Sequence, residues 1–174
     1  MRLFIAINFD KKTKENILAV QRRLKTYGKG NFTREENLHL TLTFLGEIPE
    51  ERLPDIKVAM ESVTIPKMHL EFSDIGCFRN ESELWWIGIK ENEALTKLQK
   101  DLSIALREKG FSLESRKFKP HITLARQMHA GKIPSKELLP EVFGTEVSVI
   151  TLMLSHRANG RLTYTELYSV KNEI

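Results

Sequence analysis

Two short stretches organise this sequence: HLTLTFLG at residues 39–46 and PHITLAR at residues 120–126. Each alternates apolar with polar residues in the period-two pattern of a β-strand, which turns successive side chains to opposite faces of a sheet. The histidine and the first threonine of each stretch therefore share one face, while the leucine or isoleucine residues between them point into a core. Core packing does not require a histidine and a threonine on the opposite face of the strand. These two faces are therefore the candidate functional sites of the chain.

The elements around the first stretch recur around the second. Three pairs of predicted elements keep a nearly constant offset of 81 or 82 residues: the strands from Leu3 and Leu84, the helices from Lys11 and Asn92, and the strands from His39 and His121. Simple element orders do recur by chance in chains of this class. The repeated histidine motif favours a duplication instead, with two related lobes near 3–45 and 84–126 packed about a pseudo-twofold axis.

The remaining pattern predicts an α+β chain with largely antiparallel strands. A helix is expected after Pro49, with Leu53, Ile56, Met60 and Val63 on its buried face. Further strands are expected near 69–75 and 84–90, the clearest helix over 92–109, and two final strands over 146–155 and 162–170, joined through Asn159-Gly160. Short turns between neighbouring strands favour antiparallel pairing.

Composition places the chain among soluble globular proteins. Its 174 residues are 41% hydrophobic and 29% charged, which excludes a disordered tail, and they fit a single bilobal domain over 1–174. The single cysteine forms no internal disulfide, no apolar run is long enough to cross a bilayer, and the N-terminus lacks the features of a signal peptide. We therefore expect a cytoplasmic monomer without a membrane partner. The net charge of +4 permits a polyanionic partner without requiring one.

Paired histidines suit the hydrolysis of a phosphodiester. One group must take a proton from the attacking water and another must protonate the leaving oxygen, and histidine serves either role near neutral pH. A hydroxyl two residues along each strand, on Thr41 or Thr123, can donate to a phosphate oxygen. Neither motif has a carboxylate or cysteine at the spacing of a metal site, so we expect no metal and no cofactor.

With these residues, the chain resembles the two-histidine phosphoesterase superfamily and, more closely, its bacterial and archaeal RNA 2′,3′-cyclic phosphodiesterases, also called 2′-5′ RNA ligases. The resemblance rests on the paired His-x-Thr motifs and extends over MRLFIAINF, ENLHLTLTFLGE, LWWIGIK, KFKPHITLAR and LTYTELYSV. It implies two α+β lobes with an active-site cleft between them. The implied partner is an RNA end with a 2′,3′-cyclic phosphate, tRNA fragments included, and the implied product is a 2′-phosphomonoester. Ligation to a 2′-5′ linkage is the reverse chemistry.

The resemblance also implies roles for individual residues. His39 is the implied proton donor to the departing 3′ oxygen and His121 the implied acceptor that activates water; the nearly symmetric sequence does not itself make this assignment. Thr41 and Thr123 are implied to hold phosphate oxygens. Arg126 ends the second motif, where a phosphate contact is implied. Ideal strand alternation places Arg126 on the face opposite His121, so it reaches the phosphate only through a strand end or a β-bulge.

The sequence is also compatible with other functions. The substrate could be a small cyclic nucleotide, or the chain could be a non-catalytic RNA-binding module. Several aromatic residues could stack on a base but could equally belong to the core: Phe32, Phe118 and one of Trp85 and Trp86. These two tryptophans point to opposite faces of one strand; we expect one of them in the core and the other packed beneath a helix. We expect the three other histidines to lie on the surface or in loops: His69, His129 and His156.

Overall fold

The computed structural model describes residues 1–171; residues 172–174, the end of the expected 1–174 domain, lie outside the described residues. Its elements are β1 (Arg2–Asn8), α1 (Lys11–Lys25), β2 (Asn31–Phe32), β3 (His39–Glu47), α2 (Leu53–Ser62), β4 (Met68–Arg79), β5 (Glu83–Ile89), α3 (Glu93–Glu108), β6 (His121–Met128), α4 (Ser135–Leu138), β7 (Phe143–Val147), β8 (Val149–Ala158) and β9 (Arg161–Lys171), with short 3₁₀ turns at Glu35–Asn37 and Glu50–Arg52. No helix within residues 1–171 is long and apolar enough to span a membrane.

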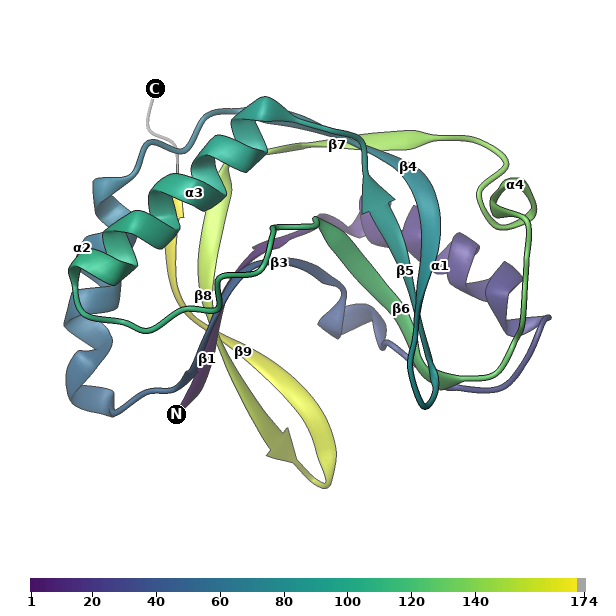
Figure 1. Ribbon diagram of the computed structural model, residues 1–174, viewed down its shortest axis with the longest axis horizontal. Helices are drawn as coiled ribbons and strands as arrows, with labels where there is room; N and C mark the ends of the chain where they lie inside the picture. The colour runs from purple at the N-terminus through teal and green to yellow at the C-terminus, as the bar shows by residue number, and fades with distance from the viewer. Residues whose placement is uncertain (172–174) are drawn as a thin grey trace.

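Two antiparallel sheets carry the two histidine motifs. One sheet has the order β3-β1-β8-β9 and the other the order β2-β6-β5-β4-β7. The sheets therefore correspond strand by strand, β3 to β6, β1 to β5, β8 to β4 and β9 to β7, with β2 added at one edge. β3 and β6 contact each other where the sheets meet, as their neighbouring positions in Figure 1 illustrate. The α+β architecture with duplicated halves is confirmed.

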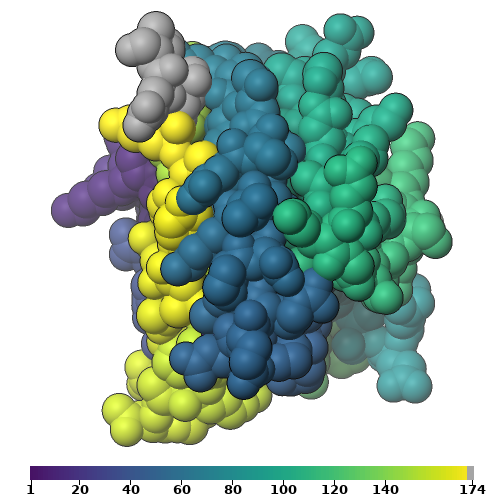
Figure 2. Space-filling view, turned by 90° about the vertical axis from the view of Figure 1, so that its left-hand side faces the viewer, coloured from purple at the N-terminus to yellow at the C-terminus, as the bar shows by residue number. Residues whose placement is uncertain are grey.

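The helices cross between the halves. α1, which follows β1, packs against α4 and β7, and the Thr13 hydroxyl donates to that of Thr145 at 2.9 Å. α3, which follows β5, packs instead against β3 and α2. Figure 2 shows α2 between β9 and α3 on the outer face of the first sheet. Both long helices begin in the same way, because the side chains of Asp10 and Asn92 accept a hydrogen bond from the backbone N–H three residues later.

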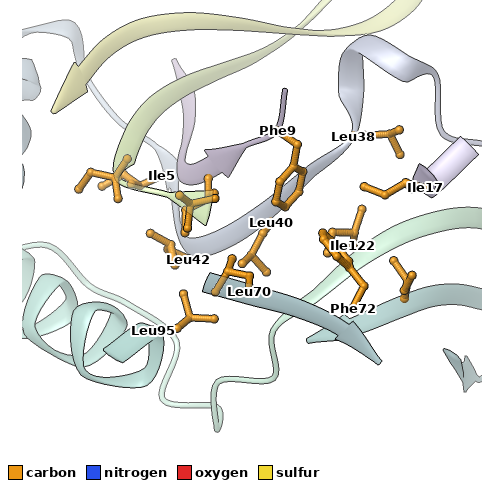
Figure 3. Packing of buried hydrophobic residues seen from close by; sticks show 14 of the residues in the cluster. Ile5, Phe9, Ile17, Leu38, Leu40, Leu42, Leu70, Phe72, Leu95 and Ile122 are labelled. Atoms are coloured by element: carbon orange, nitrogen blue, oxygen red, sulfur yellow. The ribbon is translucent and has the colours of Figure 1, made fainter. Parts of the chain in front are cut away.

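One apolar core joins both lobes. Leu40 and Leu42 of β3 lie in the same buried cluster as Leu70 of β4 and Ile122 of β6, and Figure 3 shows these side chains pointing toward one another. Apolar burial contributes about 25 cal/mol per Å², so a continuous core makes the docking of the lobes part of folding itself. The position of one histidine strand relative to the other is thus set by packing.

The C-terminal strands differ from the prediction in one respect. The expected strand over 146–155 is two strands, β7 in the sheet of β4 and β8 in the sheet of β1, separated by Ser148 alone. The apolar pattern runs through both because both are partly buried, so periodicity gives no sign that the chain leaves one sheet for the other. The final hairpin turn is as predicted, with Asn159 and Gly160 both at positive φ.

Each histidine strand contains a β-bulge at the same place. Ile5 and Ala6 of β1 pair with Thr43 and Thr41, which leaves Leu42 without an opposite residue. In the second sheet Trp85 and Trp86 pair with Ala125 and Thr123, which leaves Leu124 extra. One additional residue reverses the alternation of side chains beyond it.

A glutamine from the crossing helix supports each bulge. Gln21 of α1 is 3% exposed, and its amide nitrogen donates to the carbonyls of Thr33 at 2.7 Å and Leu124 at 3.0 Å. Gln99 of α3 donates to the carbonyl of Leu42 at 3.3 Å. The carbonyl of the extra residue thus accepts a hydrogen bond from a glutamine side chain in both lobes, and that of Leu124 also accepts one from the Thr33 backbone N–H at 3.0 Å.

We predict that Gln21→Met lowers the free energy of unfolding by about 1–3 kcal/mol, because it removes the donor to two carbonyls while keeping similar volume. Urea unfolding followed by circular dichroism measures the change. Arg22→Met, an exposed change on the same helix, is the matched control and should leave the midpoint within error. Equal stability of Gln21→Met and the wild type would contradict the supporting role of this side chain.

Candidate active site

The two histidines begin the two strands that meet between the sheets. His39 is the first residue of β3 and His121 the first of β6, and both side chains are half-buried. Their neighbours across the ladder, Asn8 and Gly88, are at corresponding places in β1 and β5. Duplication of the strand pair therefore gives each histidine the same backbone setting.

Both imidazole rings are held in the same way. Nδ1 of His39 lies 2.7 Å from the carbonyl oxygen of Asn37, and Nδ1 of His121 lies 2.6 Å from that of Lys119. A carbonyl only accepts, so Nδ1–H donates in both cases and the neutral ring carries its lone pair on Nε2. Nε2 is then the ring nitrogen that the backbone leaves free. On His39 it lies 2.9 Å from the hydroxyl oxygen of Thr41.

Burial and nearby positive charge act on both rings. Burial lowers the pKa of His39 most, the hydrogen bond to Asn37 raises this pKa, and the charges of Arg126, His121 and Lys14 lower it further. The pKa of His121 is likewise lowered by burial, raised by the bond to Lys119, and lowered by the charges of Arg126 and Lys119. Arg126 thus lies near enough to influence both rings, and a negatively charged ligand would offset this positive field.

The bulges decide which further side chains join the histidines. Beyond Leu124, the reversed alternation turns exposed Arg126 to the face of His121 and Thr123. The β-bulge that Arg126 needs in order to reach this face is therefore present. Beyond Leu42, the same device turns Phe44 away from the core to the face of His39, where it is 59% exposed and lies 6.0 Å from Phe4. Sequence reasoning missed Phe44, because alternation from Leu40 places it in the core. The repeat could have indicated this position, because Phe44 and Arg126 are 82 residues apart, as the two histidines are, and so occupy equivalent places in the two halves.

Two aromatic rings, in contact with each other, pack beside each histidine. Phe4 and Tyr164 lie 5.0 and 5.1 Å from the His39 ring, Tyr164 at right angles to it. Trp86 and Phe78 lie 6.0 and 5.5 Å from the His121 ring, Phe78 again at right angles. Tyr164 and Phe78 come from strands distant in the chain, and no local sequence pattern indicates their contacts with the histidines. Burial raises the pKa of the Tyr164 phenol, while the charges of Arg126 and Arg2 lower it.

The other residues that the sequence singled out do not join this group. Of the two tryptophans, Trp85 lies in the core, as expected of one of them. Trp86 lies on the His121 face and not beneath a helix, so that part of the expectation is wrong. Phe32 and Phe118 are partly buried against the core.

The three remaining histidines also lie apart from the pair. His69 is exposed on β4 and bonded to Glu146, His129 is exposed after β6, and His156 is half-buried on β8 and bonded to Thr165. Within residues 1–171, no three histidine, cysteine or acidic side chains gather as a metal site requires.

Two imidazoles whose Nε2 atoms are free of the backbone, a threonine hydroxyl two residues along each strand and a guanidinium whose charge acts on both rings form a site suited to acid–base chemistry on a phosphate ester. On a duplicated α+β scaffold, these features define the class of two-histidine phosphoesterases.

Comparison with known proteins gives the same class. The family described as LigT-like phosphoesterase matches twice, over residues 7–86 and 87–162, and the chain belongs to this family. It is 34% identical to an RNA 2′,3′-cyclic phosphodiesterase of Archaeoglobus fulgidus over 72% of each chain. It is 31% identical to the corresponding Escherichia coli protein over 95% of this chain and 93% of that one. The crystal structure of apo E. coli LigT superimposes with a TM-score of 0.83 at 29% identity, covering 98% of this chain and 96% of that chain, and that protein has also been crystallised with 3′-AMP.

We predict that Arg126→Met raises the pKa of both His39 and His121, because it removes a positive charge that disfavours the imidazolium form of each. Titration of the imidazole C–H signals by two-dimensional NMR measures this shift. Lys67→Met, which removes an exposed charge that acts on neither ring, is the control and should leave both titrations in place. Unchanged titrations in Arg126→Met would place the guanidinium outside the site.

Proposed function

We propose that this chain hydrolyses RNA 2′,3′-cyclic phosphate ends to 2′-phosphomonoesters without a metal ion, acting as one bilobal domain with His39 and His121 as its acid and base. The observation that carries the proposal is the duplicated histidine geometry, in which a backbone carbonyl two residues earlier fixes Nδ1 and leaves Nε2 for proton transfer. The names of the relatives support the substrate class, as does the binding of 3′-AMP by the E. coli protein.

The proposed reaction is a single in-line displacement. Nε2 of His121 takes a proton from water as the water oxygen bonds to phosphorus, and the bond from phosphorus to the 3′ oxygen breaks. Nε2 of His39 gives its proton to that oxygen, leaving a 3′-hydroxyl and a 2′-phosphate. The assignment of donor to His39 and acceptor to His121 follows the family resemblance.

Neighbouring side chains hold the phosphate and the nucleoside in this proposal. The Thr41 and Thr123 hydroxyls donate to the phosphate oxygens, and the Arg126 guanidinium neutralises charge that develops there. Phe44, exposed on the His39 face, offers a stacking surface for the base of the nucleoside that carries the cyclic phosphate. With a 5′-hydroxyl in place of water, the same chemistry joins two RNA ends through a 2′-5′ linkage.

We predict that His39→Ala and His121→Ala each reduce turnover by about 10²–10⁴, because each removes one proton-transfer group. The substrate is an oligoribonucleotide ending in a 2′,3′-cyclic phosphate, with excess EDTA, and mass spectrometry with separation of 2′- from 3′-phosphate identifies the product. His69→Ala, an exposed histidine outside the site, is the matched control. Near-wild-type turnover by either active-site variant would overturn its role, and a preference for cyclic mononucleotides would redirect the substrate assignment.

We also predict a bell-shaped pH profile for kcat/KM, because one histidine must be neutral while the other is protonated. In the free enzyme, burial and positive charge lower the pKa of both rings from the ordinary value of about 6.5. The acid therefore loses its proton at a lower pH than usual, and kcat/KM should already fall as pH rises through 6.5. Arg126→Met should move this alkaline limb upward. A flat profile between pH 5 and 8, with chemistry limiting the rate, would count against the two-histidine mechanism.

A further inference from the structure

The surface beside His121 is unlike the one beside His39. Phe78 of β4 is 37% exposed and lies 5.4 Å from Trp86 of β5, and the Lys119 ammonium lies over both rings, 5.3 Å from the first and 4.7 Å from the second. Together, Phe78, Trp86 and Lys119 form a surface of two aromatic rings and one exposed cation, which we call the Phe78 surface. Stacking on an aromatic ring combined with a charge for phosphate is how proteins bind single-stranded nucleic acid.

The sheet beneath is shaped to hold this surface in place. Trp86 is 6% exposed and lies across Gly76, where a Cβ would collide with the indole ring. Its buried N–H finds no hydrogen-bond partner within residues 1–171. The indole is thus fixed on the site face of the sheet at the cost of an unpaired donor, and it supports the exposed ring of Phe78 from below.

The position of this surface determines what it can bind in the reaction. In an in-line displacement, the attacking and departing oxygens lie on opposite sides of phosphorus. The proposed function places the departing 3′ oxygen at His39, so the donor nucleoside lies on the side of Phe44. The attacking group then arrives beside His121, next to the Phe78 surface. Water needs no such surface, but a nucleoside attacking through its 5′-hydroxyl does.

We propose that the Phe78 surface binds the nucleoside that carries the attacking 5′-hydroxyl when two RNA ends are joined, and binds it again when a 2′-5′ linkage is cleaved; this inference rests on the proposed function. In joining, the 5′ oxygen bonds to phosphorus as the bond to the 3′ oxygen breaks, while His121 takes the hydroxyl proton and His39 protonates the 3′ oxygen. The base stacks on Phe78, and the Lys119 ammonium pairs with the next phosphate of the acceptor strand. Cleavage runs the same steps in reverse.

The test measures how a donor strand divides between two products. A donor oligoribonucleotide with a 2′,3′-cyclic phosphate end is mixed with increasing acceptor strand bearing a 5′-hydroxyl, and the 2′-5′-joined and hydrolysed products are quantified. Cleavage of a preformed 2′-5′ linkage is measured in parallel. Both reactions use the same histidines and the same donor nucleoside, so any disturbance of His121 cancels in the ratio of joined to hydrolysed product.

We predict that Phe78→Ala lowers this ratio about tenfold, the size of one base-stacking contact, and raises the acceptor concentration needed for half-maximal joining. Lys119→Met should lower the ratio too, chiefly at low salt, and it keeps the backbone carbonyl that holds His121. Phe44→Ala is the matched control: both rates should fall and the ratio should hold.

An unchanged ratio in both Phe78→Ala and Lys119→Met would overturn the inference. So would a wild-type protein that hydrolyses cyclic phosphate ends but neither joins strands nor cleaves 2′-5′ linkages, a result that leaves the proposed function standing. Loss of hydrolysis itself in the wild type would instead remove the proposed function and this inference with it.

Discussion

Directly after Thr41 and Thr123, each histidine strand has a residue that its neighbouring strand leaves unpaired, and the site depends on how that residue is accommodated. The extra Leu42 and Leu124 keep their side chains in the core, so the reversal of alternation falls on the residues beyond them. A regular strand would bury Phe44 and would turn Arg126 away from His121. The bulges instead bring both to the faces of the histidines, and each bulge carbonyl is bonded to a glutamine from a helix of the other half. The strand geometry therefore depends on the crossing of the helices, because each bulge is supported by a helix from the other half of the chain.

This arrangement explains how much the sequence could predict. The two His-x-Thr motifs and the strands and helices around them are local features, predictable because hydrophobic periodicity acts over a few residues. The sheet face to which Phe44 points cannot be predicted from the residues around it, because it depends on a β-bulge that Gln99 of α3 supports. Tyr164 and Phe78 were missed for a similar reason: their contacts with the histidines form only when strands far apart in the chain are packed. The division of the expected strand over 146–155 between two sheets also escaped periodicity, because both β7 and β8 are partly buried.

The continuous core gives the site its rigidity. Leu40 and Ile122 point away from the histidine faces of their strands and belong to one buried cluster. The two aromatic rings beside each imidazole then limit rotation about its side chain, and the backbone carbonyls of Asn37 and Lys119 fix which ring nitrogen is left free of the backbone. Acid–base catalysis requires proton donors and acceptors held within hydrogen-bond reach of the reacting oxygens. In this protein, that precision comes from strands and core packing, while the loops contribute little beyond the two carbonyls.

The duplication also matches the symmetry of the chemistry. In an in-line displacement at phosphorus, the oxygen that attacks in the forward reaction is the one that departs in the reverse reaction. Two equivalent histidines, one beside each oxygen, can therefore serve both directions. Which oxygen attacks and which departs must then be decided by positions where the two halves differ. Phe44 in one half stands where Arg126 does in the other, a phenol faces His39 where Phe78 faces His121, and the ammonium of Lys119 lies on one side only. In the proposed mechanism, the equal motifs supply the chemistry, and the unequal neighbours distinguish the RNA end that carries the phosphate from the group that attacks it.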